Sequence, residues 1–137
     1  MPQDTITILH GHPLSGQLDL SDNGYSHVNQ YDRIYWIIDP NSNVASIEKI
    51  HKKDGSPNLF ILGPSRKDKE WTGKVMFAPA RDYEYYITWT EKNNASHTYD
   101  PKIAVKPGIN FYLLLSILVL ILVLASFGVR RLFFVKK

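Results

Sequence analysis

The sequence predicts a mainly β protein: an antiparallel β-sandwich followed by one C-terminal transmembrane α-helix. Short runs of β-branched and aromatic residues recur along residues 1–106, separated by clusters of Gly, Pro, Asn and Asp. The same region shows no long amphipathic helical pattern. Residues 109–129 contain no charge and no proline. At ~1.5 Å per residue they would form a helix about 31 Å long, close to the thickness of a bilayer's hydrocarbon core.

The first half of the chain contains three segments with strand character. Thr5–Leu9 alternates between β-branched and other residues, and Leu18 with Leu20 indicates a second, short strand. Arg33–Ile38 is a dense aromatic and branched run that predicts a central strand. It is followed by a turn at 39–43, where Pro fixes φ and Asp and Asn side chains bond their own backbone.

The middle of the chain is less regular. Apolar residues in Val44–Ile50 recur every third position, which is nearer a helical period, but the segment is short and lies among strands. We therefore expect an irregular strand there. Leu59–Leu62 and Lys74–Ala78 predict two further strands, and Arg66–Glu70 between them predicts a charged loop.

The last part of the soluble region predicts two strands. Glu84–Thr90 alternates, which places Tyr85, Ile87 and Trp89 on one face, and Ile103–Val105 forms the final strand. The total is seven or eight strands. We expect Trp36 and Trp89 to fill the core with their indole N–H groups hydrogen-bonded.

Charge divides the chain at the same place as hydropathy. We expect a soluble domain over 1–106, a Pro-Gly linker at 107–108, a transmembrane helix over 109–129 and a basic tail over 130–137. All 13 acidic residues precede residue 107, so the pI near 9.1 comes from the tail. The tail's four basic residues are Arg130, Arg131, Lys136 and Lys137. The basic pI therefore does not indicate a nucleic-acid partner.

Composition and motifs exclude several function classes. The chain has no cysteine, which excludes disulfides, thiolate chemistry and iron–sulfur clusters. It carries no nucleophile elbow, phosphate-binding loop, dinucleotide fingerprint or HExxH motif. We expect no enzymatic activity, no catalytic residues and no cofactor.

Three stretches together resemble the plastocyanin-like, or cupredoxin-like, sandwich domains of bacterial exported proteins. These are Asp32–Ile38, Asn58–Phe60, and Tyr83–Trp89 leading to a closing strand at Tyr99–Val105. The resemblance implies a cupredoxin-like fold, and an immunoglobulin-like sandwich stays open as an alternative. It does not extend to the copper site, because a blue-copper centre needs two His and one Cys.

His10 and His12 are the only closely spaced pair of metal-ligating side chains. On a strand, residues two apart face the same side, so both imidazoles could reach one ion. The adjacent Gly11 and Pro13 favour a strand end or loop with solvated histidines instead. A metal-handling or electron-transfer module using this pair is the alternative function.

Aromatic and basic residues supply candidates for a protein interface. Tyr83 and Tyr86 should point to different faces, and Trp71 lies in a charged stretch, either closing onto the core or contacting a partner. The basic clusters 49–53 and 66–69 are interleaved with acidic residues. They are either solvated loops or docking sites for anionic lipid or an acidic partner.

The flanks of the apolar segment predict its orientation. Phe111 and Tyr112 would anchor it at one interface, and Arg130 and Arg131 at the other. The excess of Lys and Arg after the segment predicts a cytoplasmic tail and a periplasmic or extracellular domain. Because residues 1–13 carry no signal-peptide pattern, a tail anchor with a cytosolic domain remains the alternative.

These observations favour a single-pass, membrane-anchored accessory subunit without catalytic activity. Its partners would be the lipid bilayer and a larger integral-membrane complex that it docks on or stabilises. A respiratory or photosynthetic assembly is one host that fits. We expect no nucleic-acid partner.

Overall fold

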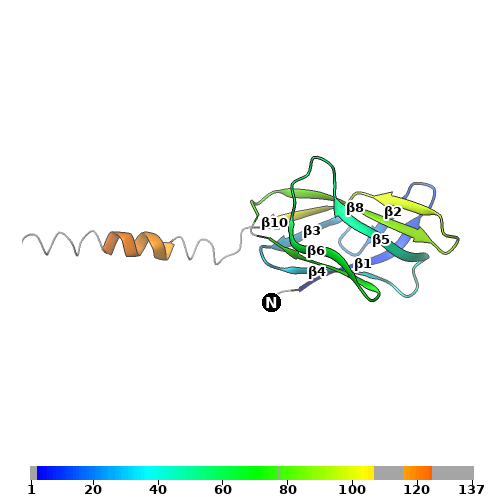
Figure 1. The fold of residues 1–137 in the computed structure, drawn as a ribbon, viewed down its shortest axis with the longest axis horizontal. Coiled ribbons are helices and arrows are strands. Elements are labelled where there is room, and N and C mark those ends of the chain that lie inside the picture. The colour runs from blue at the N-terminus through cyan, green and yellow to red at the C-terminus, as the bar shows by residue number, and fades with distance from the viewer. Residues whose placement is uncertain (1–2, 77, 107–115, 125–137) are drawn as a thin grey trace, which may run out of the picture. The chain divides into compact units, whose positions relative to one another are not determined.

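The computed structural model describes residues 3–76, 78–106 and 116–124. Contacts divide the chain into two compact units, residues 1–106 and 107–137. The first unit is built from strands that lie in two layers (Figure 1). The ten strands are β1 (Gln3–His12), β2 (Gln17–Leu20), β3 (Tyr25–Asn29), β4 (Arg33–Ile38), β5 (Val44–Lys52), β6 (Phe60–Lys67), β7 (Glu70–Val75), β8 (Asp82–Glu91), β9 (Ser96–Tyr99) and β10 (Lys102–Lys106).

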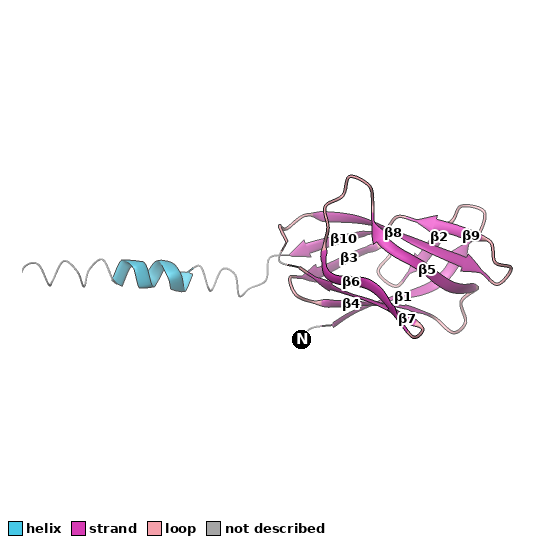
Figure 2. Ribbon diagram, viewed as in Figure 1, coloured by secondary structure: helices cyan, strands magenta, loops and turns pink. Residues whose placement is uncertain are grey.

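The strands form two five-stranded sheets. Sheet A has the order β2-β1-β4-β7-β6, and sheet B has the order β3-β10-β8-β5 with β9 also paired to β8. The predicted mainly β sandwich is confirmed, and Figure 2 shows strands and loops throughout the described residues of the first unit. The favoured strand at Val44–Ile50 is confirmed as part of β5, which pairs with β8 through two register irregularities.

The prediction that all strands are antiparallel is wrong in two places. β1 runs parallel to β4, and β3 runs parallel to β10. Parallel neighbours need a crossover, and the chain provides one by leaving sheet A after β2, adding β3 to sheet B and returning as β4. The result is two mixed sheets.

Three further predictions of local structure need correction. Two strands were missed, β3 and β9. The predicted loop Arg66–Glu70 is instead the tip of the β6–β7 hairpin, where only Asp68 and Lys69 lie outside the strands. Asp68 adopts a φ of 56°, a left-handed conformation that Asp tolerates in turns. The strand predicted over Lys74–Ala78 ends at Val75.

The core lies between the sheets and is aromatic at its centre. Trp36 and Trp89 are both fully buried, as predicted. The Trp36 ring meets Phe60 and Tyr85 edge-on, with 5.8 Å between ring centroids in each case. The Trp36 indole N–H donates to the Tyr85 hydroxyl at 3.1 Å, so the buried donor is satisfied.

The second unit is described only over 116–124, which is helical and exposed. Within the described residues, no helix has both the length and the apolar character needed to cross a membrane. The predicted span 109–129 is therefore described only in part. The linker 107–108 and the anchors Phe111, Tyr112, Arg130 and Arg131 lie outside the described residues.

Candidate interaction surface

A groove of about 700 Å³ opens where the β4–β5 turn, the start of β5 and the β6–β7 hairpin come together. We call it the edge groove, because β5 and β6 are edge strands of the two sheets. Its floor is apolar and is formed by Ile37, Ile38, Val44, Ile47 and Trp71. Its volume falls within the ~300–1,000 Å³ of typical ligand sites.

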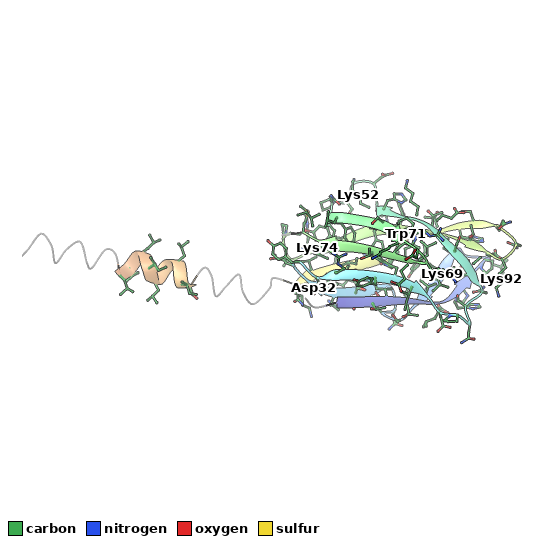
Figure 3. All side chains as sticks on the ribbon, turned by 60° about the horizontal axis from the view of Figure 1, so that its bottom comes forward. Asp32, Lys52, Lys69, Trp71, Lys74 and Lys92 are labelled. Carbon is green, nitrogen blue, oxygen red and sulfur yellow. The ribbon has the colours of Figure 1, made fainter. Side chains whose placement is uncertain are left out.

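The rim of the edge groove is mainly basic. Arg66 and Lys69 come from the β6–β7 hairpin and Lys92 follows β8, and Figure 3 shows Lys69 and Lys92 near Trp71 at one end of the domain. Among the described residues, none of these three cations forms an ion pair with a carboxylate. The groove also contains Asp39, whose carboxylate accepts the Asn41 backbone N–H at 2.7 Å, and the exposed Glu70.

Trp71 closes the floor of the groove and joins the two sheets. It lies on β7 opposite Trp36 and is 9% exposed. Its indole N–H donates to the backbone carbonyl of Ile47 on β5 at 3.2 Å. Of the two roles considered for Trp71, the structure places it as an anchor onto the core. The Trp71 ring forms part of the groove floor and does not project from the surface.

The two tyrosines proposed for an interface differ in exposure. Tyr83 lies on the inward face of β8, only 2% exposed, and its hydroxyl donates to the Pro79 carbonyl at 3.1 Å. It therefore offers no surface to a partner, which corrects that expectation. Tyr86 faces outward and is half-buried, with its ring 5.4 Å from that of His51. The predicted alternation of their faces is correct.

His10 and His12 lie at the end of β1, and both side chains are exposed. Their ring centroids are 5.2 Å apart, and the Nε2 atom of His12 lies 3.0 Å from a carboxylate oxygen of Asp19 on β2. Across 3–76, 78–106 and 116–124, no three His, Cys, Asp or Glu side chains are grouped so as to hold a metal ion. Metal binding by this pair remains a prediction.

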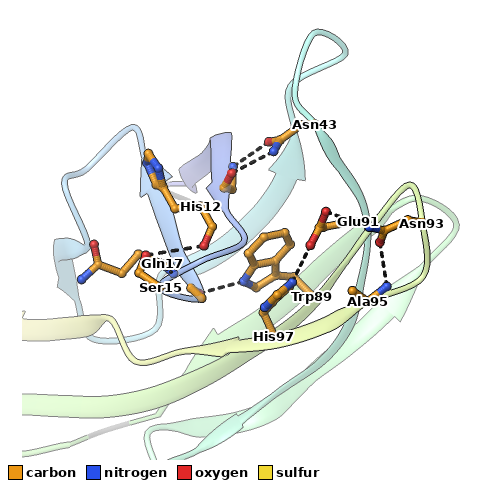
Figure 4. Close-up of polar contacts among 11 residues, drawn as sticks. His12, Ser15, Gln17, Asn43, Trp89, Glu91, Asn93, Ala95 and His97 are labelled. Atoms are coloured by element: carbon orange, nitrogen blue, oxygen red, sulfur yellow. Dashed lines mark hydrogen bonds and ion pairs between the residues drawn. The ribbon is translucent and has the colours of Figure 1, made fainter.

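Hydrogen bonds tie together the end of the sandwich that contains the groove (Figure 4). The Asn43 side-chain amide accepts the Gly11 N–H at 2.7 Å and donates to the Gly11 carbonyl at 2.8 Å. The Trp89 indole N–H donates to the Gly16 carbonyl at 3.0 Å. A side chain at Gly11 would not fit, because its Cβ would lie 2.5 Å from the Trp89 ring. These contacts hold the β4–β5 turn in place beside the groove.

The outer face of sheet B carries a different arrangement of charge. Lys53 lies 3.2 Å from Glu84 and 2.8 Å from Asp100, and Lys102 lies 3.3 Å from Glu84. Hydrogen bonds from Lys53 and Lys102 lower the pKa of Glu84. Hydrogen bonds to Asp100 and Glu84 raise the pKa of Lys53. Lys53 and Lys102 are thus each paired with a carboxylate of the same domain.

Sequence reasoning identified only part of the edge groove. The basic cluster at 66–69 and Trp71 were recognised, and both contribute to it. Lys92, Asp39 and the β4 residues Ile37 and Ile38 were missed. No local signal could have found them, because the β6–β7 hairpin and the strand pairing bring three distant segments together.

Comparison with known proteins adds little. The sequence matches no protein family and no curated protein. Among solved structures, it is similar to the reduced Cu(I) form, at pH 4, of a Pro-to-Gly mutant of amicyanin. The TM-score is 0.37 with 14% identity, covering 76% of this chain and 82% of amicyanin. Neither a fold family nor a function of this chain follows from so low a TM-score.

Proposed function

We propose that this chain is a membrane-anchored, non-catalytic accessory subunit that docks on or stabilises a larger integral-membrane complex through the edge groove. The observation that carries the proposal is the groove itself: an apolar floor surrounded by Arg66, Lys69 and Lys92. An apolar patch with a polar rim is the usual composition of a protein–protein contact. The partner segment that fits it presents an apolar side chain between acidic residues.

The position of the groove supports this role. Lys106 ends β10 beside the start of β8, whereas Lys92 follows the end of β8. The ten residues of β8 separate the two points by roughly 30 Å at ~3.3 Å per residue. The groove and Lys106 therefore lie at opposite ends of the sandwich. The groove is thus clear of the point where the chain leaves β10 and is open to a partner protein.

Gentle detergent solubilisation followed by native separation tests the proposal. The wild-type chain is expected to migrate with a larger complex, and the double variant Lys69→Glu with Lys92→Glu is expected to be released from it. Lys49→Glu makes the same charge change on β5 outside the groove, so this variant should stay bound. A wild-type chain that migrates alone in every mild detergent would overturn the proposal.

A further inference from the structure

Two basic residues face each other across neighbouring strands on the outer face of sheet A. Arg33 on β4 lies directly opposite Lys74 on β7, and both are half-buried. Their flanking residues Ile34, Gly73 and Val75 are buried, so both basic side chains point outward. In the described part of the chain, neither Arg33 nor Lys74 forms an ion pair.

Like charges directly opposite one another destabilise a strand pair. Asp32, next to Arg33 in the sequence, does not relieve the repulsion. It is 5% exposed, and its carboxylate accepts the Asn29 backbone N–H at 2.9 Å and the Asn29 amide at 3.1 Å. Arg33 and Lys74 thus lie side by side without a carboxylate partner among the described residues. This arrangement is expected where an anion outside the domain neutralises both cations.

Large exposed apolar side chains lie beside this pair. Leu62 on the edge strand β6 is opposite Lys74, and the register irregularity at Ile61 leaves both residues 60% exposed. Tyr31, in the turn before β4, is 51% exposed. Aliphatic and Tyr side chains mixed with Lys and Arg are characteristic of surfaces at the membrane–water interface.

All of these residues lie at the end of the sandwich from which the chain continues. Lys106, the last residue of β10, pairs with Asn29, two residues before Tyr31. The backbone of Val75, next to Lys74, donates to the Asp32 carbonyl at 2.9 Å. Figure 3 shows Asp32 and Lys74 at this end, away from Lys69 and Lys92. Only two residues separate Lys106 from the uncharged segment 109–129.

We propose that the surface formed by Arg33, Lys74, Ile61, Leu62 and Tyr31 binds the anionic lipid headgroups of the bilayer that holds residues 109–129. We call it the lipid-facing surface. The inference rests on the proposed membrane anchoring. The domain would then make a second contact with the membrane, in addition to the anchor. This contact is electrostatic, because basic residues are attracted to an anionic leaflet. The edge groove, at the other end of the sandwich, takes no part in this contact.

The absence of cysteine makes a direct test simple, because one introduced thiol carries the only label. Full-length chains with Leu62→Cys or Leu14→Cys receive an environment-sensitive fluorophore and are placed in nanodiscs. Leu14 is the matched control, since it is fully exposed in the β1–β2 turn at the opposite end. In phosphatidylglycerol-containing discs, the label at 62 should show higher, blue-shifted emission than in phosphatidylcholine discs, and the label at 14 should not change.

Charge variants identify the cause of the emission change. Arg33→Gln with Lys74→Gln in the Leu62→Cys chain should abolish the difference between the two lipids, and so should about 1 M salt. Lys49→Gln should leave the difference in place. Equal emission from position 62 in both lipids would overturn the inference. So would the same response to inorganic phosphate in detergent without lipid.

The same experiment separates this inference from the proposed anchoring. A full-length chain that fails to enter nanodiscs at all would contradict the anchoring. A chain that enters them but leaves the label at position 62 in water would contradict only the lipid-facing surface.

Discussion

The outer faces of the two sheets use their charged residues in opposite ways. On sheet B, Lys53 and Lys102 share Glu84, and Lys53 also reaches Asp100. On sheet A, Arg33 faces Lys74, with Leu62 as the next neighbour across the strands. The two faces belong to one small domain and rest on one core.

The difference separates cations that pair with a carboxylate of the domain from cations that have no such partner among the described residues. A carboxylate that pairs with a cation of the same domain neutralises the local potential, so the pair attracts an outside anion only weakly. Two cations placed side by side on paired strands cost stability. Among the described residues, Arg66, Lys69 and Lys92 at the rim of the edge groove likewise form no ion pair with a carboxylate. We therefore propose that Lys53 and Lys102 serve stability, whereas the cations of sheet A and of the edge groove serve binding.

The largest expected effect comes from removing the core residue beneath both faces. Trp36→Ala should lower the free energy of unfolding by about 3–5 kcal/mol, because it leaves a cavity between Phe60 and Tyr85. Urea unfolding measures this, and hydrogen exchange follows the amides of each sheet separately. Protection lost in sheet A alone would show that the two faces do not share one cooperative core.

A smaller loss is expected from Tyr85→Phe. The variant removes the hydroxyl that accepts the buried Trp36 N–H and should cost about 1–3 kcal/mol. Tyr86→Phe changes the adjacent residue on the outward face of sheet B and should stay within about 0.5 kcal/mol of the wild type. Equal effects of the two variants in urea unfolding would argue against the buried hydrogen bond.

The comparison of the two faces is tested most directly by removing one charge from each. Glu84→Gln should lower the urea midpoint, because Lys53 and Lys102 lose their shared partner. Lys74→Gln should raise stability by about 0.2–1 kcal/mol, because it relieves the repulsion with Arg33. Both effects should shrink in high salt. A destabilising Lys74→Gln would mean that the fold does use this charge.

The smallest expected effect is a pH dependence confined to sheet B. Burial, followed by the nearby Lys49 charge, lowers the pKa of His51, and Asp54 opposes this shift. Because the folded pKa lies below the unfolded value of ~6.5, the unfolded chain binds more protons and stability falls as pH drops through 6.5. His51→Asn should flatten that part of the curve of stability against pH. An unchanged curve would contradict this assignment.

The strands that sequence reasoning found are those with strong local signals. Arg33–Ile38 is a dense aromatic and branched run and Glu84–Thr90 alternates, and their tryptophans lie in the core as predicted. β3 was missed because Val28 is the only aliphatic residue in its sequence, and its pairing partner β10 lies far along the chain. The β6–β7 hairpin was missed because its tip is a continuous charged run.

The candidate surfaces were less accessible to sequence reasoning than the fold. The apposition of Arg33 and Lys74 depends on the register between β4 and β7, and one residue of slippage would separate them. Trp71 was placed in a charged loop, although the register makes it a cross-strand neighbour of Trp36. The local sequence pattern predicts which face of a sheet a side chain lies on, whereas strand pairing and register determine which residues it contacts.

The place of β10 in sheet B bears on how the domain withstands force. β10 lies between β3 and β8, and all five of its residues, Lys102–Lys106, face Tyr25–Asn29 on β3. A pull transmitted through the chain beyond Lys106 enters the sheet along this strand. The hydrogen bonds on both sides are then loaded together in shear and do not open one at a time. A domain that continues from the central strand β10 is therefore expected to resist a pull applied to the chain beyond Lys106.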